Sequence, residues 1–299
     1  MARPIAVSTV PSGIKLLSRE RCRALRAFVS NRMAILGTVI LLLVAVLALA
    51  GPIISPYDPD KPSLSERLQP PSAAHLLGTD EMGRDLATRI AYGARISVAL
   101  GFFAVALAAL LGVPLGLMAG YFGGRWDTVI QRAVDVLLTL PSIVLSIALV
   151  SVMGAGVVSV ILAVAITSTP VYARLARAVA LTLRGRDYVM AARSLGSSDL
   201  RILLRHILPN ALAPIIVQAS LGVGTAILVA SSLGFLGLGV QPPMAEWGVM
   251  LSRGRTFITT APFVITFPGV AIALTVLAFN LLGDGLRDAL DPRMQQLAK

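Results

Sequence analysis

Cysteine, charged residues and aromatic residues are all scarce in this chain. Of its 299 residues, 14% are charged and 5% aromatic, whereas 56% are hydrophobic. The single cysteine, Cys22, excludes an intrachain disulfide bond and a cysteine-based metal cluster. Together with a mean hydropathy of +0.81, the low charge content excludes a soluble globular protein and indicates a protein that crosses a membrane several times.

The chain also lacks the residues that common catalytic sites need. Lysine occurs only at positions 15, 61 and 299, so the sequence has no Gly-x-x-x-x-Gly-Lys-[Ser/Thr] loop for the phosphates of ATP. The two histidines, His75 and His206, fall in loops that we expect on opposite sides of the membrane, which excludes a shared metal or a catalytic triad. We therefore expect no catalytic residue, no metal and no cofactor, and any energy from ATP must come from another polypeptide.

The formal net charge is +11, and the basic residues lie beside apolar segments rather than on a polar surface interleaved with aromatic residues. This placement favours positive-inside topology over a nucleic-acid partner. Residues 1–32 carry seven basic residues and only one acidic residue. We expect this tail, and with six spans the C-terminal tail as well, in the cytoplasm.

Uncharged stretches predict an all-α fold of six transmembrane helices, each of which needs ~20 apolar residues. The 38 residues between Asp135 and Arg174 are too many for one helix, so we expect two spans there. In chain order, the expected segments are a tail (1–32), the first span (33–54), an external loop with an interfacial helix (55–94), a permease core (95–283) with spans 96–120, 128–152, 157–178, 211–233 and 262–283, and a second tail (284–299). Within the core, a cytoplasmic loop (184–210) precedes the fifth span and an outer loop (234–261) follows it.

Several features before residue 95 have two interpretations. Ala48-Leu49-Ala50 fits a signal-peptide cleavage site, but the long basic leader favours an uncleaved span. Arg84, Arg89 and Arg95 are spaced for an amphipathic helix that lies along the interface. The run GTDEMGRD (78–85) offers carboxylates for calcium, yet it lacks EF-hand spacing, and we expect a capped helix start.

Two acidic residues in the core also have alternative interpretations. Asp135 is either the partner of Arg132, three residues earlier, at the interface or a proton-relay carboxylate, and we expect the ion pair. Glu246, with Arg253 and Arg255, is expected where the outer loop emerges into water, either as a contact for a soluble partner or as a solvated loop end.

Glycines recur at positions 112, 116, 120 and 124 of the chain. This Gly-x-x-x-Gly spacing permits close packing of two helices. Ordinary membrane-helix composition also accounts for it.

The longest polar interval in the second half of the chain is RGRDYVMAARSLGSSDLRILLRHILPN (184–210). Residues 188–195 favour a helix, Gly196 breaks it, and Asp199 opens a second helix behind Ser198 as its cap. The second helix carries an apolar stripe at positions 200, 203, 204, 207 and 208, whereas Arg201 and Arg205 lie off the stripe. We expect Pro209 to end this helix.

Motifs in this loop and outside it resemble those of a known family. Ala191-Ala192, Gly196 and Ile207-Leu208-Pro209 are similar to the EAA loop of permease subunits in bacterial ABC importers, although Met190 stands where members usually have Glu. Outside the loop, four motifs resemble the C-type permease of dipeptide, oligopeptide and glutathione importers: Gly78-Thr79-Asp80, Gly83-Arg84-Asp85, SLGFLGLGVQPP with Glu246-Trp247-Gly248, and LLGDGLRDALDPR.

The resemblance implies a type I ABC importer permease in the bacterial cytoplasmic membrane, a transport subunit without its own ATPase site. The implied partners are a homologous second permease subunit, two ABC ATPase subunits that bind ATP and Mg, an extracytoplasmic peptide-binding protein and membrane lipid. The residues implied in ATPase coupling are Tyr188, Met190, Ala191, Ala192, Leu195, Gly196, Ser198, Asp199, Arg201, Arg205, His206, Leu208 and Pro209. Those implied in an outer gate or receptor contact are Phe235, Leu236, Gly237, Leu238, Gly239, Glu246, Trp247 and Arg253.

The alternative class is an ion-coupled secondary transporter that acts alone. Such a protein should carry carboxylates near the middle of its spans, and this chain has none between the expected span ends. We therefore prefer the importer hypothesis. The sequence does not identify the substrate, because a peptide, glutathione or a nickel chelate would each be delivered by a separate receptor that sets the selectivity.

Overall fold

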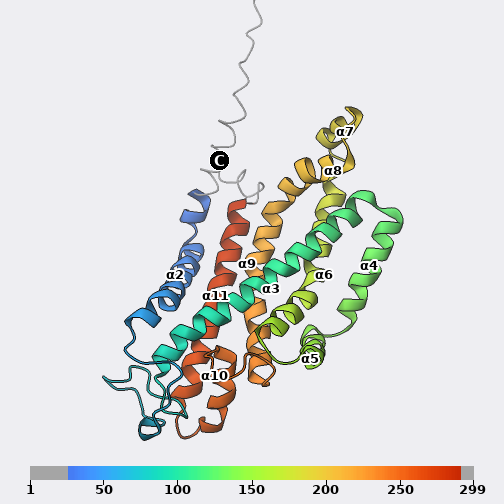
Figure 1. The fold of residues 1–299 in the computed structure, drawn as a ribbon. Helices are drawn as coiled ribbons and strands as arrows, with labels where there is room; N and C mark the ends of the chain where they lie inside the picture. The colour runs from blue at the N-terminus through green and yellow to red at the C-terminus, as the bar shows by residue number, and fades with distance from the viewer. Residues whose placement is uncertain (1–25, 291–299) are drawn as a thin grey trace, which may run out of the picture.

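A computed structural model describes residues 26–290 as a bundle of long helices (Figure 1). Cys22, most of the predicted N-terminal tail and residues 291–299 lie outside this range. The long helices are α2 (Arg32–Ile54), α3 (Leu86–Phe122), α6 (Val157–Leu183), α9 (Leu208–Phe235) and α11 (Phe263–Leu290). By length and composition, residues 26–290 contain five candidate spans, or six if the bent pair α4 (Gly124–Thr139) and α5 (Ser142–Met153) is one span. The predicted all-α membrane fold is confirmed.

The bundle has two ends of different character (Figure 1). Helix α2 begins and α11 ends at the end that carries α7 and α8, where Asn31 Nδ2 donates a hydrogen bond to Asp288 Oδ2 at 3.0 Å. The opposite end carries α10 and residues 55–85. We call the first the coupling-loop end, after the loop at 184–210 in which the predicted coupling residues lie, and the second the α10 end. The short elements are η1 (Leu64–Glu66), α7 (Asp187–Ser194), α8 (Asp199–Ile202), η2 (Leu203–Ile207), α10 (Trp247–Gly254) and η3 (Arg255–Phe257).

Helices α3 and α6 form the most extensive helix contact in the described bundle. Three of the predicted packing glycines, Gly112, Gly116 and Gly120, lie in this contact. A Cβ atom on any of them would run into a carbonyl oxygen of α6, at 2.6 Å in the case of Gly112 and Thr169 O. Gly124 has open space instead. The first three glycines therefore allow the two backbones to touch, as the spacing predicted.

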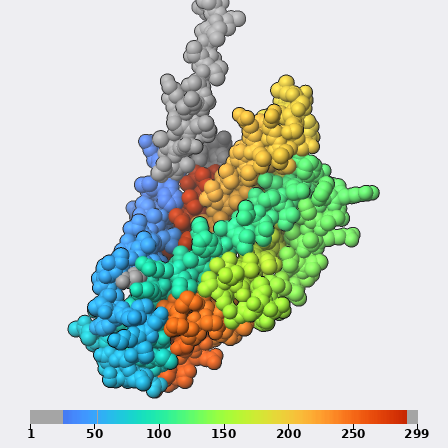
Figure 2. All heavy atoms as spheres, viewed as in Figure 1, coloured from blue at the N-terminus to red at the C-terminus, as the bar shows by residue number. Residues whose placement is uncertain are grey.

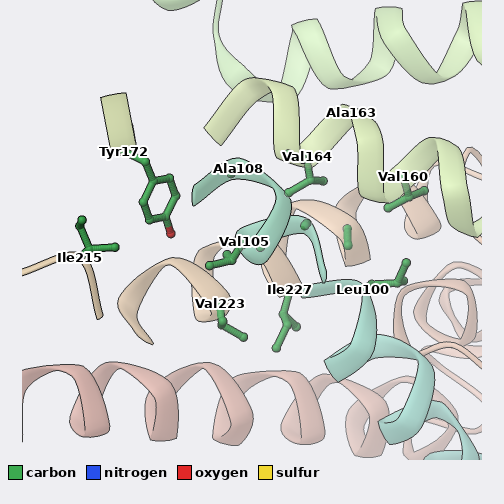
Figure 3. Close-up of a cluster of buried hydrophobic side chains, with 14 of the residues drawn as sticks. Leu100, Val105, Ala108, Val160, Ala163, Val164, Tyr172, Ile215, Val223 and Ile227 are labelled. Carbon is green, nitrogen blue, oxygen red and sulfur yellow. The ribbon is translucent and has the colours of Figure 1, made fainter. Parts of the chain in front are cut away.

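The apolar core lies where α3, α6 and α9 meet (Figure 3). The residues at its centre are buried valine, leucine and isoleucine side chains, including Leu100 and Val105 from α3, Val160 and Val164 from α6, and Val223 and Ile227 from α9. Ridges of such side chains interlock between helices and hold the three together.

The amphipathic interfacial helix predicted before the second span is wrong. Helix α3 runs unbroken from Leu86 through the expected span, and Arg89 is buried rather than at a lipid interface. The run at 78–85 is a capped helix start, as expected, because Asp85 Oδ2 accepts a hydrogen bond from the backbone N–H of Thr88 at 2.8 Å.

The single helix predicted over 128–152 is also wrong, because the chain bends by 90° between α4 and α5. The cause is Pro141, which has no N–H to continue the helix and disfavours helical geometry at Leu140, whose backbone is extended. Helix α4 also begins earlier than predicted, at Gly124.

The predicted ion pair between Asp135 on α4 and Arg132 is wrong. The Asp135 carboxylate accepts from Arg174 Nη2 on α6 at 2.6 Å, and the two side chains are 59% and 54% exposed. Because α4 packs against α6, Arg174 on that neighbouring helix comes close enough to bind Asp135 in place of Arg132, three residues earlier in α4.

Helices α6 and α11 extend beyond their predicted ends, to Leu183 and Leu290. Gly283 and Gly285 do not close α11, because both serve helix contacts instead. A Cβ atom on Gly285 would run into Ala34 of α2, and one on Gly283 would lie 2.5 Å from the side chain of Leu221 on α9. Glycine at these positions permits close packing without ending the helix.

Candidate functional site: the 184–210 loop

The turn after α7 is built on Gly196, as the sequence predicted. Its φ is +78°, in the left-handed region that glycine adopts without strain. The Gly196 N–H donates to Arg193 O at 3.0 Å and the Ser197 N–H to Ala192 O at 3.1 Å, the bond pair of a Schellman motif. These bonds satisfy two of the last carbonyl groups of α7.

The second helix differs from its prediction at both ends. Ser198 occupies the N-cap position with extended backbone, but its side chain makes no capping hydrogen bond. Pro209 does not end the helix. The π-helical turn η2, in which the Leu208 N–H donates to Leu203 O, joins α8 to α9 and places Pro209 in the first turn of α9, where its missing N–H costs little.

The loop packs on the bundle through one face and projects the other (Figure 2). Val189, Ala192, Ile202, Leu203 and Ile207 are buried in the main core cluster. The predicted stripe is therefore wrong in part, because Leu200 and Leu204 are exposed and Ile202 takes their place. Leu195, at the tip, is 86% exposed. Apolar side chains held out at a projecting tip mark an interaction surface.

Most of the predicted coupling residues lie on the projecting face. The exposed ones are Tyr188, Met190, Ala191, Leu195, Gly196, Ser198, Asp199, Arg201, Arg205 and Pro209, whereas His206 and Leu208 are half-buried. Ala192 is buried against its own bundle, so only Ala191 of the alanine pair is open to a partner.

Sequence reasoning missed two residues at this site, Tyr121 and Arg193. Tyr121 lies in the last turn of α3 and is 5% exposed. Its hydroxyl accepts from Arg193 Nη2 at 2.9 Å and bonds to Asp199 Oδ1 at 2.6 Å. Neither contact has a local sequence signal, because α3 and the loop are more than seventy residues apart.

At the α10 end, the expectation that Glu246 emerges into water is wrong. Glu246 is 1% exposed and caps α10 by accepting from the N–H groups of Gly248 and Val249 at 2.8 and 2.9 Å. Burial raises the pKa of Glu246 above its usual range, and the hydrogen bonds from Gly248, Val249 and Ser97 offset part of this rise. The carboxylate therefore positions α10 instead of facing a partner.

Trp247 is also buried, and its Nε1 donates to the carbonyl oxygen of Ile90 on α3 at 3.0 Å. Of the other predicted outer residues, Leu236 and Gly237 are exposed, Phe235, Leu238 and Arg253 are half-buried, and Gly239 is buried. The exposed part of the predicted outer site is thus the short turn at 236–237.

A buried ion-pair cluster joins residues 55–85 to α3 and α10. Arg84 bonds to Asp80 at 2.7 Å, and Arg89 lies 3.4 Å from the same carboxylate. Arg253 of α10 pairs with Glu81 at 3.0 Å. Within residues 26–290, no group of three or more His, Cys, Asp or Glu side chains could hold a metal ion.

Comparison with known proteins identifies the family. Residues 112–296 match the binding-protein-dependent transport system inner membrane component family, and residues 23–71 match the N-terminal TM domain of oligopeptide transport permease C. The dipeptide transport system permease protein DppC of Alkalihalophilus pseudofirmus is 50% identical over 91% of this chain and 90% of its own length. The glutathione transport system permease protein GsiD of Pectobacterium atrosepticum is 48% identical over 90% of each chain.

A solved structure supports the fold. Inward-facing MetNI methionine ABC transporter aligns with a TM-score of 0.55 at 18% identity, over 67% of this chain and 95% of the matched chain. The chain therefore belongs to the family of binding-protein-dependent transport system inner membrane components, the permeases of ABC importers, and carries the N-terminal domain typical of oligopeptide transport permease C.

Proposed function

We propose that this inner-membrane permease is one half of a heterodimeric channel that imports small peptides. The other half is a homologous permease, two ATPase subunits dock on the cytoplasmic side, and a peptide-binding protein delivers the substrate from outside. The observation that carries the proposal is the 184–210 loop, in which two short helices hold Met190, Leu195 and Leu200 out of the bundle.

The loop has the properties that an ATPase contact needs. Its buried face anchors it to the core cluster, so a force on the tip reaches the bundle. Its exposed face combines apolar side chains with Arg201 and Arg205, the composition of an interface that a partner covers. The permease has no phosphate-binding loop of its own, and in this class of transporter the ATPase is a separate subunit.

The proposed substrate class is peptides of two or three residues, glutathione included. Relatives named as dipeptide, di/tripeptide and glutathione permeases are 46% to 50% identical to this chain over about nine-tenths of its length. Selectivity among these peptides belongs to the delivering receptor.

The proposed orientation puts the coupling-loop end in the cytoplasm. Helix α2 begins and α11 ends at that end (Figure 1), and the basic residues of 1–32 precede α2 in the sequence. An impermeant maleimide should therefore label Cys22 in inverted vesicles and leave it unlabelled in intact spheroplasts. The reverse pattern would refute the orientation.

The functional test is reconstitution with the neighbouring subunits. The complex should copurify with two ATPases and import radiolabelled dialanine or glutathione into proteoliposomes only when ATP and the receptor are present. An ion-coupled transporter working alone would instead need no ATPase, and its uptake would stop when a protonophore collapses the proton gradient. That result would contradict the proposal.

A further inference from the structure

Within the coupling loop (184–210), the two short helices α7 and α8 both make a side-chain hydrogen bond to the same hydroxyl group of the bundle. Tyr121 Oη bonds to Arg193 at 2.9 Å and to Asp199 at 2.6 Å, and the Arg193 guanidinium lies 5.3 Å from the Tyr121 ring centroid. Among the residues that the structure describes, these are the only side-chain hydrogen bonds from α7 or α8 to another helix.

The two bonds lie on opposite sides of the turn. Arg193 belongs to α7 and Asp199 to α8, and Gly196 stands between them with a φ of +78° and nothing within 4 Å of where a Cβ would be. No atom therefore packs against Gly196 itself, and the turn depends on its backbone hydrogen bonds and on contacts made by α7 and α8 on either side of it. Hydrogen bonds to charged partners are short and directional, so the Tyr121 hydroxyl orients both helices against α3.

Helix α3 is well placed to carry a movement away from the loop. At Gly112, Gly116 and Gly120 its backbone lies directly against the backbone of α6. At its other end, α3 accepts a hydrogen bond from Trp247 at Ile90 O. A helix of 37 residues thus joins the coupling loop to the α10 end without a break.

We propose that Tyr121 is a positioning residue for coupling: its hydroxyl holds α7 and α8 in register with α3, so that a displacement of the loop moves the α3–α6 pair and, through it, the α10 end. The proposal rests on the proposed function, because it assumes that ATPase subunits move the loop. Apolar packing of Val189 and Ile202 keeps the loop attached, whereas the hydroxyl makes the attachment rigid.

The test uses Tyr121→Phe, which keeps the ring and its stacking on Arg193 but removes both hydrogen bonds. The reporter is a single cysteine, Leu236→Cys, placed at the exposed turn of the α10 end in a Cys22→Ser background. In the parent complex, ATP with vanadate should change the rate at which maleimide labels Leu236→Cys. Tyr121→Phe should reduce this change at least about fivefold, the lower end of typical couplings between sites.

Tyr172→Phe is the matched control. The Tyr172 hydroxyl is buried on α6 and has no hydrogen-bond partner within residues 26–290, so its removal should leave the labelling change intact. The double variant Tyr121→Phe with Asp199→Asn should lose no more than Tyr121→Phe alone, because both act through the same hydrogen bond.

The outcomes separate this proposal from the proposed function. If no ATPase copurifies with the parent, the proposed function is wrong and the positioning role goes with it. If the parent binds ATPase and Tyr121→Phe leaves the nucleotide-dependent labelling change at full size, the positioning role alone is refuted. A loss of copurified ATPase in Tyr121→Phe as large as the loss of the labelling change would also refute it, because the hydroxyl would then serve docking.

Discussion

The two ends of the bundle treat their charged residues in opposite ways. At the α10 end, Asp80, Arg84, Arg89 and Glu246 are all buried and all paired or hydrogen-bonded. At the coupling-loop end, most charged side chains are exposed, and leucines stand out in solvent beside them. Within residues 26–290, charged side chains that are buried occur only at the α10 end, whereas the charges of the 184–210 loop are on a surface that a partner can cover.

This difference separates stability from coupling. A buried charge that loses its partner costs several kcal/mol of stability, whereas an exposed one costs little. Substitutions at the α10 end should therefore lower the free energy of unfolding, and those at the coupling-loop end should lower transport while the fold persists.

The largest effect is expected for Arg89→Met. Removing this buried guanidinium takes one of two cations from the Asp80 carboxylate, which keeps Arg84 at 2.7 Å, so we expect a cost near the lower end of the roughly 3–5 kcal/mol for breaking a buried pair. The thermal unfolding midpoint of the purified protein should drop clearly. Arg205→Met, on the exposed face of the loop, is the control and should change stability by less than about 0.5 kcal/mol. Equal midpoints for the two variants would contradict the contrast between the ends.

An intermediate effect is expected for Gly196→Val. A Cβ at this position has no atom within 4 Å, so the expected cost is backbone strain at a φ of +78°, about 1–3 kcal/mol, and a distorted turn. The protein should insert and fold, while copurified ATPase and ATP-driven uptake fall. Gly185→Val is the control, since Gly185 has equal space and no left-handed φ. If Gly196→Val kept full ATP-driven uptake, the loop would have no role in coupling and would be an ordinary solvated turn.

The smallest effect is expected for Asp135→Asn. The pair with Arg174 is more than half exposed, and such pairs contribute about 0–1 kcal/mol. Uptake in proteoliposomes should remain close to that of the parent. Complete loss of uptake at a normal protein level would instead support the ion-coupled transporter.

Local chemistry in the sequence predicted the helices and the Gly196 turn well. Hydropathy located the spans because lipid requires long apolar helices, and Gly196 was identified because few other residues adopt a left-handed turn. What the sequence did not predict depends on distant partners. Asp135 pairs with Arg174 on another helix, and buried Glu246 accepts a hydrogen bond from Ser97 of α3. Tyr121 contacts Asp199 of the loop, which is distant in the sequence. The break at Pro141 was readable in principle, but the uncharged length of the segment outweighed the proline.

The glycine contact between α3 and α6 also has a consequence for how the sequence can change. Where two side chains touch, a larger residue on one side can be accommodated by a smaller one on the other. At Gly116 the opposing atom is the carbonyl oxygen of Ala173, which every residue type carries. No change of side chain on α6 can move this carbonyl oxygen away. A larger residue at position 116 therefore cannot be compensated from α6, and we expect glycine to be retained there.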